Sequence, residues 1–389
     1  MKKNILSVAL LSLGMCIASC GDDTVVQSIP EGTKEVSIEE DELDINEQNL
    51  TNWTQYAVQV ANLLTKDATS LRRAWAESYN GGEAYAETFK HPSATNTSYK
   101  SYAACLQEII EGCADIANEV GTAKIGEPRD LWENGKYTEA VYAVESWYSF
   151  HSIDDYANNI RSIQNAFNGS DNGTEATHSI ASYLKQHNNT LYTEMKVAIT
   201  SAITAIESVA APFRSHIGNP SVLAAQQACS NLESLLSNKL KAIMMEAGEE
   251  DLKDIVVNYV DNVVLPTYSN LVLLNTTLNT AVRNLANNPS NRTFEAAAEA
   301  WLAARAPWEK SEAFLFGPVA DLGLDPNMDS WPLDAAALAN KLTSGNFEDL
   351  EWEGEFDEES EVIEAAQNVR GFHTLEFLLF KNGEPRKIR

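Results

Sequence analysis

Apolar side chains recur at spacings of three and four residues through most of the chain. Between residues 53 and 78, Trp53, Tyr56, Val60, Leu64 and Trp75 fall on one face of a helix. This spacing predicts a long amphipathic helix that buries one apolar stripe. Similar stripes run through residues 99–120, 138–166, 177–211, 221–246, 250–286, 292–316 and 357–380.

Glycine, proline and asparagine interrupt this helical pattern. Breaks of this kind fall at residues 80–82, 126–128, 169–173, 218–220, 287–289 and 317–318. No stretch alternates apolar and polar residues in the way that predicts a half-buried strand. Long helices with brief connections indicate an all-α fold, which we expect to consist of two packed helical bundles, residues 50–246 and residues 250–389.

The first 49 residues have a different character. Two lysines precede an apolar stretch at residues 5–17, and small residues then lead to Cys20. This order predicts a signal peptide over residues 1–19, cut before a cysteine that carries a lipid. A plain signal peptide followed by an incidental cysteine is the alternative. Because residues 20–49 are acidic and hold little apolar content, we expect a lipid-anchored tether.

These features predict an outer-membrane lipoprotein of the cell envelope, with the membrane as a partner through the lipid on Cys20. The chain has 28 basic and 56 acidic residues, a formal net charge of −28. Such a charge excludes nucleic acid as a partner and makes cations the natural ligands. Acidic residues are densest at positions 343–361, where weak apolar periodicity predicts a solvated loop.

Three cysteines follow Cys20 in the sequence, namely Cys105, Cys113 and Cys229. Cys105 and Cys113 lie eight residues apart on one predicted helix, which is too far apart for a disulfide. We therefore expect all three to be buried thiols.

The last amphipathic stripe contains the only candidate for chemistry that the residues themselves provide. His373 and Glu376 are three residues apart, so on a helix they share one face and can converge on a metal ion. An imidazole and a carboxylate suit iron, zinc or manganese. The alternative is a histidine that only packs in the core, beside Leu375, Phe377 and Leu378.

The form Gly371-x-His373-x-x-Glu376 resembles the signature of the imelysin family. Further blocks that resemble the family lie at residues 116–124, 145–161, 264–268, 300–318 and 329–334. The resemblance covers residues 50 to 389 and implies a helical, imelysin-like fold. In the family order that we expect, the block around residue 145 follows the motif, whereas here it precedes it. We therefore predict a circularly permuted chain, which a surface with neighbouring termini tolerates.

The resemblance implies two metal-dependent functions and leaves a third open. Imelysin-like domains resemble the helical part of a periplasmic component of ferrous-iron uptake, which implies iron capture or delivery. The family was first described as peptidases, which implies a metallopeptidase, although a zinc peptidase motif of the form H-x-x-E-H would need histidine where Phe377 stands. The third function is a surface module that binds peptide or glycan without metal, through a groove lined by aromatic residues such as Trp147, Trp301 and Trp331. The alternative is that these side chains, at helical spacing, pack in the core.

The blocks also imply side chains that line the same site as His373 and Glu376. These are Arg305, Trp308, Glu309, Asp329, Glu145 and Asp155, and the blocks of the same site region also contain Glu312 and Asp334. The alternative for each of the charged residues alone is ordinary helix capping or salt bridging.

Overall fold

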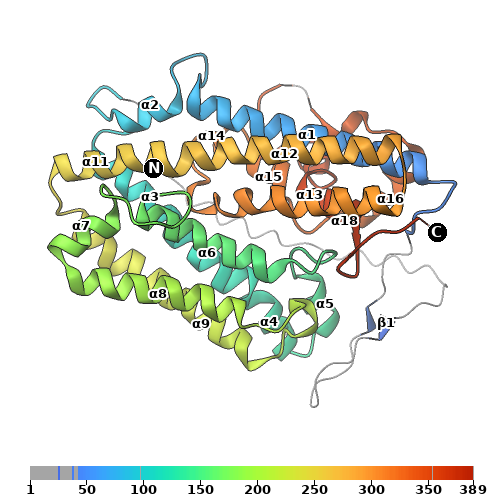
Figure 1. Ribbon diagram of the computed structural model, residues 1–389, viewed down its shortest axis with the longest axis horizontal. Coiled ribbons are helices and arrows are strands. Elements are labelled where there is room, and N and C mark those ends of the chain that lie inside the picture. Colours follow the sequence, from blue (N-terminus) through green and yellow to red (C-terminus); the bar gives the residue numbers. More distant parts are fainter. Residues whose placement is uncertain (1–24, 27–36, 39–42, 97, 353, 389) are drawn as a thin grey trace.

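The structure is a computed structural model that describes residues 25–26, 37–38, 43–96, 98–352 and 354–388. Helices dominate it, as the apolar stripes predict (Figure 1). The predicted signal peptide and Cys20 lie outside the described residues. None of the helices within those ranges has both the length and the apolar character needed to cross a membrane.

One group of helices is built around the first predicted stripe. Helix α1 (Leu50–Ala76) packs along α12 (Leu265–Asn287), which in turn packs along α13 (Asn291–Glu309). The short helix α18 (Gly371–Leu379) lies against both α1 and α13. These elements form the upper layer in Figure 1.

A second group occupies the lower part of the same view (Figure 1). It is built from α3 (Tyr102–Glu119), α6 (Ser152–Asn168), α8 (Asn189–Glu207) and α9 (Pro220–Ser234), which pack on one another. The two groups meet where α6 contacts α13 and where α3 contacts the 3-10 turn η5 (Glu312–Phe314). The candidate site lies at this junction.

Shorter elements complete the described chain. The helices are α2 (Tyr85–Lys90), α4 (Gly126–Glu133), α5 (Tyr137–Tyr142), α7 (Ile180–His187), α10 (Lys241–Met244), α11 (Glu249–Tyr259), α14 (Pro318–Asp321), α15 (Leu324–Asp329), α16 (Ala335–Ser344) and α17 (Glu361–Gln367). Three π-helical turns are η1 (Val120–Lys124), η3 (Leu235–Leu240) and η4 (Val260–Val264), and two further 3-10 turns are η2 (Phe213–Ser215) and η6 (Glu348–Leu350). Strands β1 (Val25–Val26) and β2 (Ser37–Ile38) pair antiparallel, as do β3 (Phe380–Lys381) and β4 (Glu384–Pro385).

Several predicted stripes are wrong in their extent. The stripe at 138–166 is broken between α5 and α6, the stripe at 292–316 ends as a helix at Glu309, and the stripe at 357–380 is broken before α18. The last break has a steric reason in Gly371. Its φ is +89°, a backbone conformation that favours glycine. A Cβ at this position would lie 2.6 Å from the carbonyl oxygen of Met328. The break thus lets α18 begin in close contact with α15.

Other predictions from the sequence are confirmed. Cys105, Cys113 and Cys229 are buried free thiols, and residues 343–361 are mostly irregular and exposed. The boundary near residues 246–250 stays a prediction, and helix packing crosses it, since α1 packs along α12.

Candidate functional site

Helix α18 carries the predicted motif into the interior of the protein. All nine of its residues are buried, and the exposed fractions of His373 and Glu376 are 1% and 0%. Neighbouring helices hold its backbone: the indole of Trp53 donates to the Leu378 carbonyl over 2.8 Å, and the indole of Trp301 donates to the Phe372 carbonyl over 3.0 Å. The motif therefore lies on a short helix that two longer helices fix in place.

The imidazole of His373 lies between two carboxylates. Its Nδ1 is 3.0 Å from Glu376 Oε2, and its Nε2 is 3.1 Å from Asp329 Oδ1. Burial and the nearby Arg305 disfavour the charged ring, but the interactions with Asp329 and Glu376 outweigh them and raise the pKa of His373 to about 9. The ring of Trp331 lies 4.9 Å from the imidazole, centroid to centroid.

Glu376 has a full set of hydrogen-bond partners. Its Oε1 accepts from the amides of Tyr148 and Ser149, at 3.0 and 2.8 Å, and from Ser149 Oγ at 2.7 Å. These donors belong to the segment between α5 and α6 that the helical stripe failed to predict. Because Oε2 faces His373, the carboxylate of Glu376 fixes the orientation of the ring.

Arg305 on α13 is the central cation of the site. Its Nε lies 3.3 Å from Asp155 Oδ2, and its Nη2 lies 2.6 Å from Glu309 Oε1 and 3.4 Å from His373 Nε2. Its Nη1 forms an ion pair with Asp329. Arg305, Asp155 and Glu309 are each 0% exposed. One buried guanidinium therefore forms ion pairs with three carboxylates that come from three helices.

Asp329 connects the histidine to the arginine. It stands at the end of α15, where its Oδ2 accepts a 2.7 Å hydrogen bond from the indole of Trp308. Burial raises its pKa, but the charge of Arg305 and the hydrogen bond with His373 outweigh burial and hold the pKa of Asp329 well below its usual range. Asp329 is therefore a carboxylate anion with partners on several sides.

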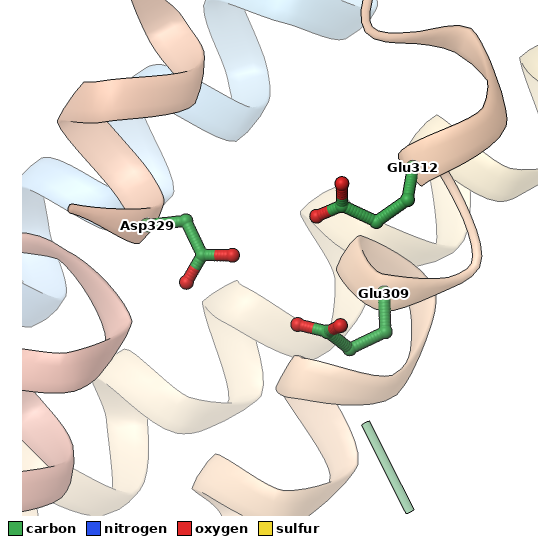
Figure 2. A group of neighbouring side chains, drawn as sticks. All are labelled: Glu309, Glu312 and Asp329. Atoms are coloured by element: carbon green, nitrogen blue, oxygen red, sulfur yellow. The ribbon is translucent and has the colours of Figure 1, made fainter. Parts of the chain in front are cut away.

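Glu309, Glu312 and Asp329 form a carboxylate triad. One oxygen from each lies within 4.8 Å of one oxygen from each of the others, and Figure 2 shows the three groups facing a shared space. Burial raises the pKa of Glu309 to about 8, against the lowering effect of Arg305. Burial also raises the pKa of Glu312 well above its ordinary value. Such a cluster has the geometry to hold a cation.

A second basic residue lies beside the triad. Lys124 ends the π-helical turn η1, and its ammonium is 3.0 Å from Glu145 Oε2 and 3.5 Å from Glu119 Oε1. Burial and the charge of Asp329 raise the pKa of Asp325, on α15, to about 7. Acidic side chains thus extend from the triad toward the surface, where the side chain of Glu119 is 51% exposed.

The structure brings nearly all of the predicted site residues together. One connected network, which we call the Asp329 cluster, is formed by the part-buried Asp329 and by the buried residues His373, Glu376, Arg305, Glu309, Asp155 and Trp308. Glu145 lies outside it, paired with Lys124. The predicted aromatic groove is wrong for Trp147 and Trp301, which are 4% and 0% exposed and pack in the core.

Two residues of the site differ from the expectation in different ways. Glu312 belongs to a block that the resemblance assigns to the site region, but the stripe at 292–316 placed it on a helix that in fact ends at Glu309. Ser149 was not predicted as a site residue; it also belongs to a block, and it lies in a loop where a helix was predicted. Serine is common in helices and loops, so no feature of spacing distinguished it.

Comparison with known proteins identifies the family. The family model described as Imelysin matches residues 38–238 and 264–388. The chain belongs to the imelysin family. Among solved structures, an imelysin peptidase from Bacteroides ovatus is 51% identical, with a TM-score of 0.87 over 90% of this chain and 99% of the relative. The all-α fold expected from the sequence is confirmed.

The names of two further relatives of this imelysin-family chain refer to iron regulation. Iron-regulated protein A from Synechococcus elongatus is 30% identical over 159 residues, which are 41% of this chain and 36% of that protein. The chain thus spans about a third of the length of this curated relative. A solved iron-regulated protein A precursor from Parabacteroides distasonis is 33% identical over 44% of this chain and 50% of its own, with a TM-score of 0.41. The circular permutation stays a prediction.

Proposed function

We propose that this imelysin-family chain is a cell-envelope lipoprotein that binds a metal ion in the Asp329 cluster, with iron as the first candidate. Its role would be iron uptake or delivery. The observation that carries the proposal is the convergence of buried carboxylates from α13, η5 and α15 within 4.8 Å of one another, with His373 3.1 Å from the same Asp329.

The side chains present fit a metal ion. Carboxylate oxygens and an imidazole nitrogen are ligands for iron, manganese and zinc. Glu376 is engaged by three donors and by Nδ1 of His373. It is therefore placed to orient the ring, as carboxylates do around metal-bound histidines. The side chains that surround the candidate ion position are Asp329, Glu309 and Glu312, with His373 Nε2 beside Asp329.

The choice of iron and of the envelope rests on two further observations. The curated relative from Synechococcus elongatus is described as an iron-regulated protein. The order of lysines, apolar stretch and Cys20 favours a lipid anchor outside the cytoplasm. An acidic domain held there would attract cations from its surroundings.

A metallopeptidase is the second candidate, because the solved Bacteroides ovatus relative is described as an imelysin peptidase. Peptide hydrolysis requires a scissile carbonyl to reach the metal and its activated water. Here His373, Glu309 and Arg305 are at most 1% exposed. A surface cavity of about 540 Å³ lies elsewhere, between α1 and residues 345–351. The buried cluster therefore favours ion binding over peptide cleavage.

The test is the metal content of the purified full chain after exposure to iron, zinc, manganese and copper, measured by mass spectrometry. We expect about one iron per chain in the wild type and a loss of that metal in Asp329→Asn. Asp334→Asn is the matched control, since Asp334 only caps α16. Thermal unfolding of each variant checks that it remains folded. Absence of metal from the wild type would overturn the proposal, and zinc with peptide cleavage would favour the peptidase.

A further inference from the structure

Buried acceptor oxygens near the carboxylate triad lack hydrogen-bond donors. Glu312 is 7% exposed, and its carboxylate makes no hydrogen bond or ion pair with another described residue, while Figure 2 shows it directed toward Asp329 and Glu309. Glu309 Oε1 and Asn159 Oδ1 are also buried without a hydrogen bond. Arg305 approaches Glu309 Oε1 to 2.6 Å as an ion pair, without the alignment of a hydrogen bond.

The nearby basic groups are committed to other partners. Arg305 is shared among Asp155, Glu309 and Asp329, and none of its described contacts is to Glu312. Lys124 lies 3.0 Å from Glu145 and 3.5 Å from Glu119. Buried carboxyl groups without donors cost free energy unless a proton or a cation neutralises them, so this geometry suits a ligand that supplies positive charge in place of those protons.

His373 does not share this space. Its Nδ1 faces Glu376, and its Nε2 faces Asp329 Oδ1 and Arg305 Nη2. The three oxygens that lie within 4.8 Å of one another come from carboxylates alone. The imidazole thus lies on the Arg305 side of Asp329, outside the carboxylate triad.

We infer that a hard cation binds to the carboxylates of Glu309, Glu312 and Asp329, and that His373 and Glu376 position Asp329. This inference rests on the proposed metal-binding function and assigns the ligands within it. It departs from the expectation that His373 and Glu376 themselves hold the ion. A site of oxygen ligands favours Mn²⁺, Mg²⁺, Ca²⁺ or iron, whereas imidazole and thiolate favour Cu²⁺ or Zn²⁺.

Mn²⁺ is the probe that tests this ligand set, because its unpaired electrons report the coordinating atoms. The experiment measures Mn²⁺ affinity of the full chain by electron paramagnetic resonance and searches for ¹⁴N coupling by spin-echo modulation. We expect one bound Mn²⁺ without imidazole nitrogen coupling. We also expect Glu312→Gln to weaken binding at least tenfold, because a neutral amide replaces an anionic ligand of similar shape.

Glu299→Gln is the matched control, since it removes the same charge from the exposed face of α13. Its Mn²⁺ affinity should equal that of the wild type. Imidazole coupling, or an unchanged affinity in Glu312→Gln, would overturn the ligand assignment and leave the proposed metal binding intact. Absence of bound Mn²⁺ would also overturn the assignment, while the metal content measured with iron, zinc and copper decides the proposed function separately.

Discussion

Two buried arginines in this protein have opposite surroundings. Arg370, 3% exposed, pairs with Asp67, donates to the Leu350 carbonyl over 2.9 Å, and lies 5.5 Å from the ring of Trp352. Its one unsatisfied polar atom is a donor, Nε. Arg305 has three carboxylates around it, and the unsatisfied atoms beside it are acceptors.

The difference between the surroundings of Arg370 and Arg305 distinguishes a structural ion pair from a candidate ion-binding site. At Arg370 one positive charge meets one negative charge, and the pair holds residues near 350 against α1 and the start of α18. At Arg305 several acidic groups surround one guanidinium, so the folded protein bears a desolvation cost that protonation of Glu309 and Glu312, or a bound cation, offsets. Excess buried acceptors, more than the presence of a buried ion pair, therefore mark the proposed site.

The largest effect is expected from Arg305→Met. Removing this guanidinium leaves Asp155, Glu309 and Asp329 buried with little compensating charge, and loss of one partner of a buried pair costs about 3–5 kcal/mol. Urea denaturation of the metal-free protein at pH 7 measures the change in the free energy of unfolding. A loss of under about 1 kcal/mol would mean that the carboxylates are not held by Arg305.

Arg370→Met should cost somewhat less, about 3 kcal/mol, because it leaves a single buried carboxylate. The double variant Arg370→Met with Asp67→Leu should recover most of that stability, since apolar side chains can replace a balanced buried pair. Combining Arg305→Met with Asp155→Leu should recover little, because two carboxylates remain. Equal recovery in the two double variants would remove the distinction between the regions.

The pH dependence of stability should differ between the wild type and His373→Gln. The ordinary pKa of histidine is 6.5, and that of folded His373 is about 9. A raised folded pKa gives a stabilising contribution that is full below pH 6.5 and is lost as pH rises through 9. We expect the histidine to account for a loss of roughly 3 kcal/mol in the metal-free wild type over this window, at about 1.4 kcal/mol per pKa unit.

Melting temperatures from pH 6 to pH 10 provide the measurement. The carboxyls of Glu309 and Glu312, whose pKa values are raised, also destabilise the protein as pH rises, and they remain in His373→Gln. The variant should therefore show a shallower slope than the wild type. Identical slopes would show that the histidine does not carry its proton in the folded protein.

The fold was predictable because helical stripes depend on local spacing, whereas the helix breaks depend on distant contacts. The sequence pattern of residues 143–151 does not indicate that the amides of Tyr148 and Ser149 donate to Glu376, which lies 228 and 227 residues away in the sequence. The break before Gly371 likewise depends on the approach of α15. Such contacts leave no periodic signal in the sequence.

The site was predictable in part. The spacing of His373 and Glu376 places them on one helix face, and the resemblance to the imelysin family supplied Arg305, Glu309 and Asp329. Neither argument revealed that Glu376 faces the Nδ1 of His373, since that depends on side-chain orientation in three dimensions. The resemblance also placed Glu312 in the site region, but its position beside Glu309 was not predictable, because it arises from the turn that follows α13.

The smallest effect, and the one of opposite sign, is expected from Glu312→Gln. Because Glu312 has no hydrogen bond or ion pair with the described residues and burial raises its pKa, replacing it by a neutral amide should stabilise the metal-free protein by about 1 kcal/mol. Arg370 offers the contrast, since removal of one charge from its pair destabilises the protein. Urea denaturation without and with Mn²⁺ measures the free energy of unfolding of both proteins. Without metal the variant should be more stable than the wild type. When Mn²⁺ is added, the variant should gain less stability than the wild type, because a ligand stabilises the folded state only to the extent that it binds. A destabilised Glu312→Gln would mean that the carboxylate already has a stabilising role in the metal-free protein and that the excess of acceptors at Arg305 is smaller than the geometry indicates.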